Sequence, residues 1–273
     1  MGKIQDTVTR SGIVLVTTLL LLSGFSGNAV SDAGQCRLEA GGNCAGADLT
    51  GVRLSNADLR GIDLRGAVLY RCDFRDIDLR GANLKGADII ECPMTDVQLD
   101  EANLAGGSIV RSNFTNVSAR RSNMVGAEII QTVIVRGTLK DAAMAKAKIT
   151  QSSVRNSDLR AVDLRKIQTR QVNLKKVKLA GANLSNARLV QITMVKGTSL
   201  RGAVIRKSLL VESDLKKVDM RDANLQQTFI WRSNLTGSNV NNVRVAGATC
   251  TAVSLPDGSR ISGAVFAGPC DGL

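Results

Sequence analysis

A large apolar residue returns at every fifth position through most of this chain, and this period constrains the fold more than any other feature. The series runs from Leu49 to Met194, and only Ala119 and Thr169 interrupt it with a smaller side chain. A period of five matches neither the 3.6-residue period of a helix nor the two-residue period of a strand. The repeating unit is therefore a short extended segment followed by a turn.

A second position supports the same unit. Two residues before each apolar centre, as at Ala47 and Val52, the chain places only small or apolar residues and never a charged or amide side chain. Four such units close a rectangular coil in which both positions point inward. The register slips by one residue at 195–199 and then resumes from Leu200 to Cys250. The slip is either a tolerated bulge or a kink between two rigid arms.

A fixed period sustained over such a length is typical of a solenoid, in which each turn buries its apolar face against its neighbours. The sequence resembles the pentapeptide-repeat family, whose unit is A(D/N)LXX. The resemblance covers roughly residues 42–250 and implies an all-β fold, a right-handed quadrilateral β-helix with about 20 residues per coil. Matches to the unit include Ala47-Asp48-Leu49, Ala57-Asp58-Leu59, Ala82-Asn83-Leu84, Ala102-Asn103-Leu104, Ala182-Asn183-Leu184 and Ala223-Asn224-Leu225.

The amino terminus has the pattern of a secretory signal peptide at residues 1–33. Lys3 and Arg10 precede the apolar run 13–22, and small residues follow it. The run is short for a membrane span, so we expect a cleaved signal rather than a retained anchor. The remaining chain then divides into an N-terminal cap at 34–44, the repeat domain at 45–250 and a hairpin-like C-terminal cap at 251–273. We expect a periplasmic or secreted bacterial protein that meets the membrane only transiently, through its signal.

All the cysteines follow the signal, and an exported chain permits disulfides between them. Cys36 with Cys44 and Cys250 with Cys270 would close the two ends of the column, where a solenoid frays. Cys72 and Cys92 stack one coil apart, close enough for a bridge. We nevertheless favour unpaired apolar cysteines there, because small inward positions commonly hold Cys as a hydrophobic residue.

One outward column of the coil is apolar. The residue after each centre on this face should meet solvent, yet it is hydrophobic except at Thr150 and Arg170. A contiguous exposed apolar stripe usually marks an interface. We predict that this apolar column binds a protein partner or a second copy of the chain, with a homodimer as one outcome. Its members are Tyr70, Ile90, Val110, Ile130, Val190, Val211 and Trp231.

The opposite face presents a ladder of cations. Several of its members follow an Asp by two residues, as Arg60 follows Asp58, so we favour local ion pairs on a solvated face. The alternative function is binding of an anionic polysaccharide or membrane headgroups. We refer to these residues as the cationic ladder: Arg60, Arg80, Arg120, Lys140, Arg160, Arg201 and Arg221.

Catalytic chemistry has little support in the sequence. The chain contains no His and no metal-binding Cys spacing, so we expect no enzyme activity, metal, cofactor or small-molecule substrate. Well-known members of the family that the sequence resembles bind DNA gyrase by imitating DNA, which requires an acidic surface. This chain has 36 basic and 24 acidic residues and a net charge of +12, the wrong sign for mimicry. Nucleic-acid binding is also not expected, since no aromatic residues accompany the ladder. An effector delivered to a host stays open as a further role.

Overall fold

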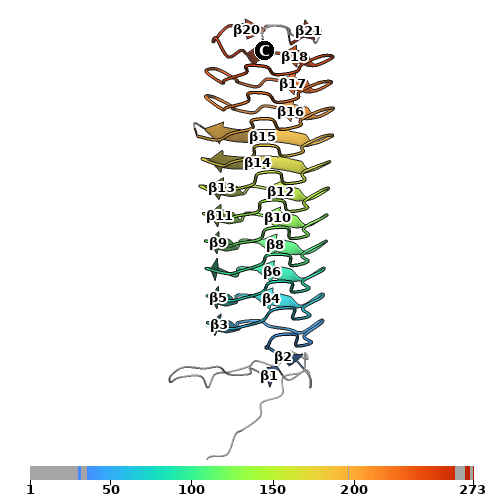
Figure 1. Cartoon of the computed structure of the whole chain (residues 1–273), viewed down its shortest axis with the longest axis vertical. Helices are drawn as coiled ribbons and strands as arrows, with labels where there is room; N and C mark the ends of the chain where they lie inside the picture. The colour runs from blue at the N-terminus through green and yellow to red at the C-terminus, as the bar shows by residue number, and fades with distance from the viewer. Residues whose placement is uncertain (1–29, 32–35, 196, 262–267, 271–272) are drawn as a thin grey trace, which may run out of the picture.

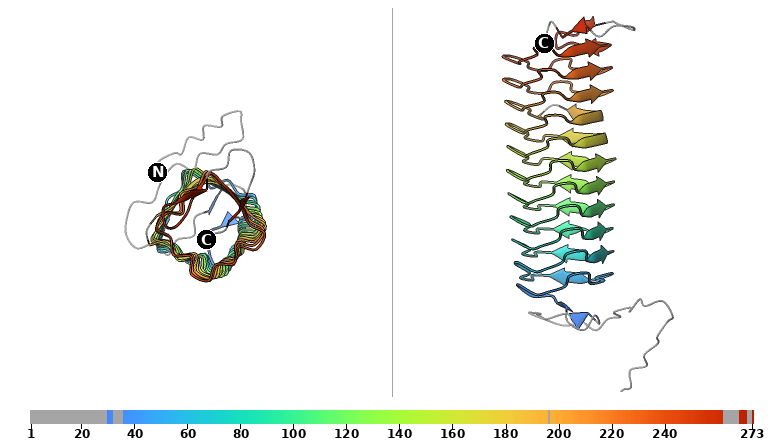
Figure 2. Two further views of the ribbon diagram at one scale, coloured as in Figure 1. Left: turned by 90° about the horizontal axis from the view of Figure 1, so that it is seen from above. Right: turned by 90° about the vertical axis from the view of Figure 1, so that its right-hand side faces the viewer.

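The chain folds into one long column of stacked coils with a roughly square outline (Figures 1 and 2). The computed structural model describes residues 30–31, 36–195, 197–261, 268–270 and 273. The fold is the predicted right-handed quadrilateral β-helix. The expected signal peptide lies outside the described residues except for Val30 and Ser31.

Two adjacent faces of the column consist of parallel strands. The first strand face contains β4 (Val68–Tyr70), β6 (Asp88–Ile90), β8 (Ser108–Val110), β10 (Glu128–Ile130), β12 (Lys148–Thr150), β14 (Gln168–Lys175), β15 (Arg188–Val195), β16 (Leu209–Val211), β17 (Phe229–Trp231) and β18 (Thr249–Thr251). The second contains β3 (Arg53–Ser55), β5 (Asp73–Arg75), β7 (Met94–Thr95), β9 (Asn113–Thr115), β11 (Val133–Val135), β13 (Ser153–Arg155) and β19 (Val253–Ser254). β14 and β15 continue through the corner onto this second face.

The two ends of the column carry antiparallel pairs instead. β1 (Val30–Ser31) pairs with β2 (Cys36–Arg37) at the amino-terminal end. At the carboxyl-terminal end, β19 pairs with β20 (Arg260–Ile261), and β18 pairs with β21 (Gly268–Pro269). The carboxyl-terminal pairs cover edges of β18 and β19 that would otherwise be open to other chains. Within the described residues, no helix is long and apolar enough to span a membrane.

The coils are joined by backbone hydrogen bonds along the column. The amide of Leu79, for example, donates to the carbonyl of Gln98 in the next coil at 2.7 Å. Before the slip at 195–199, partners lie twenty residues apart, as Lys148 pairs with Glu128. Across it, Leu189 pairs with Leu210, and beyond it partners again lie twenty residues apart, so the stack continues without a break (Figure 1).

The apolar centres fill the interior as predicted. Leu59 and Leu79 are fully buried, and the small positions two residues before the centres are buried with them. Where these positions carry a hydroxyl, it hydrogen-bonds to the backbone. The Ser112 hydroxyl accepts the amide of Cys92 at 3.1 Å and lies 3.0 Å from the carbonyl of Val110. Thr169 is buried at a centre position, and its hydroxyl has no hydrogen-bond partner among the described residues.

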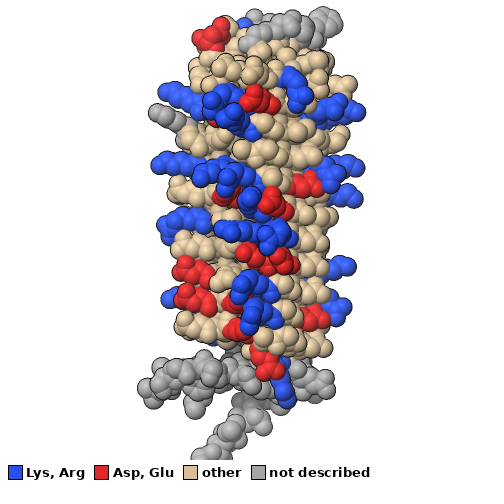
Figure 3. All heavy atoms as spheres, viewed as in Figure 1, with Lys and Arg blue, Asp and Glu red and all other residues tan. Residues whose placement is uncertain are grey.

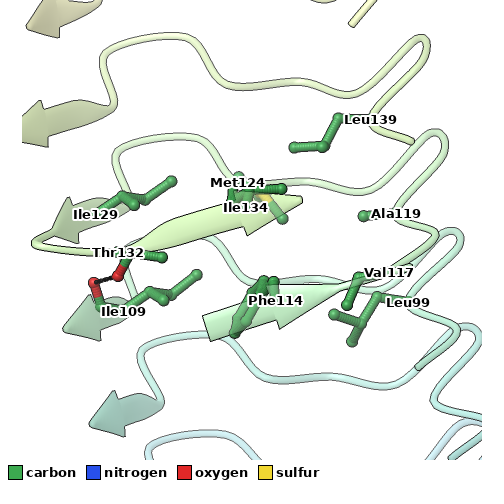
Figure 4. Close-up of a pocket in the computed structure, with 10 residues that line it drawn as sticks. All are labelled: Leu99, Ile109, Phe114, Val117, Ala119, Met124, Ile129, Thr132, Ile134 and Leu139. Carbon is green, nitrogen blue, oxygen red and sulfur yellow. Dashed lines mark hydrogen bonds between the residues drawn. The ribbon is translucent and has the colours of Figure 1, made fainter. Parts of the chain in front are cut away.

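The smaller centres leave room inside the column. A cavity of about 10 Å³ lies beside Ala119, which replaces the Leu found at the same position one coil before and one coil after, Leu99 and Leu139 (Figure 4). A larger cavity of about 50 Å³ occupies the coils from Ile129 to Met194. Both are lined almost entirely by apolar side chains, so they belong to the core.

Each end of the column is closed by a disulfide, as predicted. Cys36 bonds to Cys44, and Cys250 bonds to Cys270. The structure also joins Cys72 to Cys92, which corrects our preference for unpaired cysteines there. These two residues pair because they stack in register, which brings their Cα atoms to 4.7 Å.

Candidate functional site

The apolar column lies along the first strand face, on the third residue of each short strand. Each of its seven side chains is half-buried rather than fully exposed, because neighbouring coils stack closely above and below. Thr150 and the exposed Arg170 interrupt the column at its centre, leaving an N-terminal and a C-terminal apolar segment. The seven residues are Tyr70, Ile90, Val110, Ile130, Val190, Val211 and Trp231.

Further apolar side chains widen both segments. Val68, which is 36% exposed, lies beside Tyr70 in β4. Leu209 and Phe229 are half-buried at the outward positions of β16 and β17. Sequence reasoning missed all three, although the signal was present: in a strand, the residues before and after an inward centre both point outward.

A row of polar residues borders the apolar column at the corner. Glu91 contacts Arg71 at 3.0 Å and Arg111 at 2.9 Å, and the hydrogen bond from Arg71 lowers the pKa of the Glu91 carboxyl. Arg71 lies over the Tyr70 ring, 4.9 Å from its centroid, and Arg232 lies 4.3 Å from the Trp231 centroid. The chain's single Tyr and single Trp are thus each held by a cation.

The cationic ladder occupies the opposite face, where most of its charge is neutralised locally. Four members pair with the Asp two residues before them. These pairs are Arg60–Asp58 at 2.6 Å, Arg80–Asp78 at 2.6 Å, Arg160–Asp158 at 2.6 Å and Arg221–Asp219 at 2.9 Å.

The other three members of the ladder differ in their contacts. Arg201 lies 3.3 Å from Asp222, and Lys140 lies 3.7 Å from Asp141. Arg120 donates its backbone amide to Asp100 at 2.7 Å. The ladder as a whole therefore presents little free positive charge.

These ion pairs make the stability of the folded protein depend on pH. Hydrogen bonds from Arg60 lower the pKa of Asp58 to about 2, and Arg80, Arg160 and Arg221 lower the pKa of their Asp partners in the same way. A depressed folded-state pKa adds stability above the unfolded pKa, about 3.9, and that stability is lost as the pH falls toward the folded value. We expect the melting temperature to fall over this range.

The matched test replaces the same four arginines with Gln. In this variant the Asp pKa values return toward normal, so acidification from about pH 5 to pH 2 should lower the melting temperature less than in the natural chain. Equal losses in the two proteins would contradict a stabilising role for the ladder pairs.

Within the described residues, no group of three or more His, Cys, Asp or Glu side chains is placed to hold a metal ion. The acids of both faces contact cations instead, as Glu91 and Asp58 do. The surface thus offers two kinds of contact, an apolar column with a polar border and a face of paired charges.

Comparison with known proteins identifies the family to which this architecture belongs. A family model of pentapeptide repeats, in 8 copies, matches residues 47–86, 98–133, 152–191, 198–237 and 213–249, which is more than half of the chain. The chain belongs to the pentapeptide repeat family. No curated protein matches this pentapeptide repeat protein in sequence.

A solved structure shares its fold, and others show weaker similarity. HetL, a pentapeptide repeat protein involved in heterocyst differentiation regulation in the cyanobacterium Nostoc sp., is 22% identical, with a TM-score of 0.61 over 80% of this chain and 91% of HetL. QnrB1, a plasmid-mediated fluoroquinolone resistance protein, is 16% identical, with a TM-score of 0.38 over 75% of this chain and 93% of QnrB1. A thylakoid-lumen pentapeptide repeat protein from Arabidopsis thaliana is 23% identical, with a TM-score of 0.36 over 36% of this chain and 69% of its own.

Proposed function

We propose that this pentapeptide repeat protein is an exported, non-enzymatic scaffold that binds protein partners through its apolar column. The observation that carries the proposal is the run of half-buried apolar side chains on the outward side of the first strand face. Contact of such a run with water is unfavourable, so burying it against a partner lowers the free energy. The signal-like residues 1–33 and the three disulfides support export.

A second copy of the chain is the partner that the column favours. Its apolar segments lie on either side of the coils that hold Thr150 and Arg170. A twofold axis through the coil of Thr150 would bring apolar onto apolar at three levels on each side of it, and would place Ile130 opposite the partner's Arg170. In this antiparallel arrangement Tyr70 faces the partner's Trp231, and Ile90 faces the partner's Val211. Arg170 lies near the partner's Glu128, an opposite charge. Such self-complementarity is what a twofold interface requires.

Light scattering of the purified chain tests self-association. We expect the mass of a dimer, and a monomer when Ile90, Ile130 and Val190 are changed to Lys. The charges introduced at positions 90 and 190 would be buried against apolar surface, and the charge at position 130 would face the partner's Arg170. A control adds the same three charges on other faces, at Thr95, Thr115 and Ala180, and should stay dimeric. A monomeric natural chain would rule out self-association through the column.

Orientation has its own test. Chains carrying Tyr70→Cys, mixed with chains carrying Trp231→Cys, should cross-link to each other under mild oxidation, whereas neither should cross-link to itself. Tyr70→Cys chains that cross-link among themselves would show the parallel arrangement instead.

The alternative, anion binding by the cationic ladder, receives less support. Its Arg60, Arg80, Arg160 and Arg221 side chains are already held by carboxylates at 2.6 to 2.9 Å. An anionic ligand would have to displace these intramolecular partners, so it would gain little.

A further inference from the structure

Free positive charge gathers at a different place on this protein. Between Asp163 and Glu212 the sequence contains no acidic residue, while basic residues continue throughout. We refer to six of them, which lie outside the apolar column's face, as the basic belt. All six side chains are exposed, and no carboxylate of the described residues lies within 4.0 Å of their charged groups. They are Lys166, Lys175, Lys176, Lys178, Arg206 and Lys207.

At one corner of the coil, the residue type changes between the N-terminal coils and the coils of the basic belt. In the N-terminal coils it is occupied by glycine, as at Gly106 and Gly126, with φ angles of 65° and 69°. In the belt the same corner carries Lys166 and Lys207, at φ angles of 59° and 55°. Glycine adopts this left-handed conformation without steric cost, whereas lysine does not. Asn186 lies between these lysines and Gln227 follows them at the same corner, so the change is from glycine to polar side chains that include two cations unpaired among the described residues.

The diagonally opposite corner, half a coil away, changes in the same direction. Asp76 and Asp96 occupy it in the N-terminal coils, and Lys176 occupies it in the belt, again with a left-handed backbone. Lys166 and Lys176 therefore extend from opposite corners of the same coil. Figure 3 shows basic side chains protruding at both edges of the upper half of the column, with acidic ones more frequent below.

Uncompensated charges that lie close together reinforce one another. Lys166 and Lys207 share a corner two coils apart, which is about 10 Å at the usual strand spacing and about one Debye length at 0.1 M salt. Lys175, Lys176 and Lys178 are near neighbours within one coil, so each group of cations acts on the same stretch of a ligand. The ladder contrasts with this, since most of its arginines are paired within the chain. The belt is consequently the part of the described surface where an added anion gains most.

We propose that the basic belt binds a linear acidic polysaccharide. The belt spreads over three faces and two opposite corners, so a planar membrane would contact only part of it, whereas a flexible polymer can follow it around the column. Nucleic acids gain much of their affinity from bases stacked on aromatic rings. The belt contains none, and the outward aromatic residues Tyr70, Phe229 and Trp231 lie on the apolar column's face. A polymer with one carboxylate per sugar needs only spaced cations.

The test compares two variants of equal net charge. The belt variant carries Lys166→Gln, Lys176→Gln and Lys207→Gln, and the ladder variant carries Arg60→Gln, Arg80→Gln and Arg160→Gln. Gln is tolerated at such corners, because Gln131, Gln151 and Gln171 adopt φ angles of 50°, 50° and 56°. A third protein, with Lys166, Lys176 and Lys207 changed to Arg, keeps the charge. Cooperative thermal unfolding well above the temperature of the titration confirms that all are folded.

Calorimetric titration with sodium polygalacturonate, a linear polyuronate, measures the binding. We expect binding that weakens with added salt, a loss of roughly tenfold or more in the belt variant, and near-normal affinity in the ladder and Arg variants. Neutral dextran should not bind. Phosphatidylglycerol vesicles and a single-stranded oligonucleotide should bind at least tenfold more weakly.

Three results would overturn the proposal. If the natural chain does not bind polygalacturonate, the belt has no such ligand. If the belt and ladder variants lose affinity equally, net charge rather than the belt is responsible. If vesicles or the oligonucleotide bind as tightly as the polyuronate, the partner belongs to another class.

Discussion

Replacing Leu99 with Ala is expected to lower the free energy of unfolding by about 4 to 5 kcal/mol, near the upper end for such changes. Leu99 is fully buried and stacks between Leu79 and Ala119. Because the neighbouring coil already has an alanine and a cavity of about 10 Å³, the new space would merge with existing space rather than collapse. Urea denaturation measures the loss.

A matched control and a rescue sharpen this prediction. Leu79→Ala removes the same atoms between two leucines, Leu59 and Leu99, so we expect a smaller loss of about 3 kcal/mol. In the Leu99→Ala background, Ala119→Leu should restore about 2 kcal/mol by moving a leucine into the enlarged space. Equal losses at both sites, with no rescue, would contradict a loosely packed core around Ala119.

Removing the disulfide at the carboxyl-terminal end, by Cys250→Ala and Cys270→Ala, is expected to destabilise the last coils by about 3 kcal/mol. The bond closes a loop with a sequence separation of 20, and loops of this length give that magnitude. Because each coil contacts only its neighbours, the effect should stay local. The antiparallel pairs β18–β21 and β19–β20 would open first.

Native-state hydrogen exchange measures this local effect. The amide of Leu235, which donates to Ser254, should lose roughly a hundredfold of its protection, whereas the amide of Leu79 should not change. The Cys36→Ala, Cys44→Ala variant is the control, since it should expose the other end instead. A uniform loss of protection along the chain would show that the column unfolds as one unit.

Much of the fold follows from the sequence, because a period of five leaves few structures in which every centre is buried. The inward positions of Leu59 and Leu79 were predicted correctly. The ion pairs of the ladder were predicted as well, since the Asp two residues before an Arg, as in Asp58 and Arg60, lies on the same outward side.

Other features depend on relations that the period does not describe. The spacing of Cys72 and Cys92 allows a bridge but also suits two separate buried thiols, so it could not decide between them. Leu209 and Phe229 lie outside the five-residue register of the centres. The basic belt was missed because its residues lie on several faces of a few neighbouring coils. Reading the sequence one outward column at a time does not bring them together.

The register between neighbouring coils has a consequence for how such a gene can change. Leu189 pairs with Leu210 across the slip, so an extra residue at a corner leaves the coils beyond it aligned. An in-frame duplication that adds a whole coil, or a deletion that removes one, would preserve that alignment even more readily. The length of the rod, and the distance between its apolar segments, can therefore change during evolution through simple copying errors.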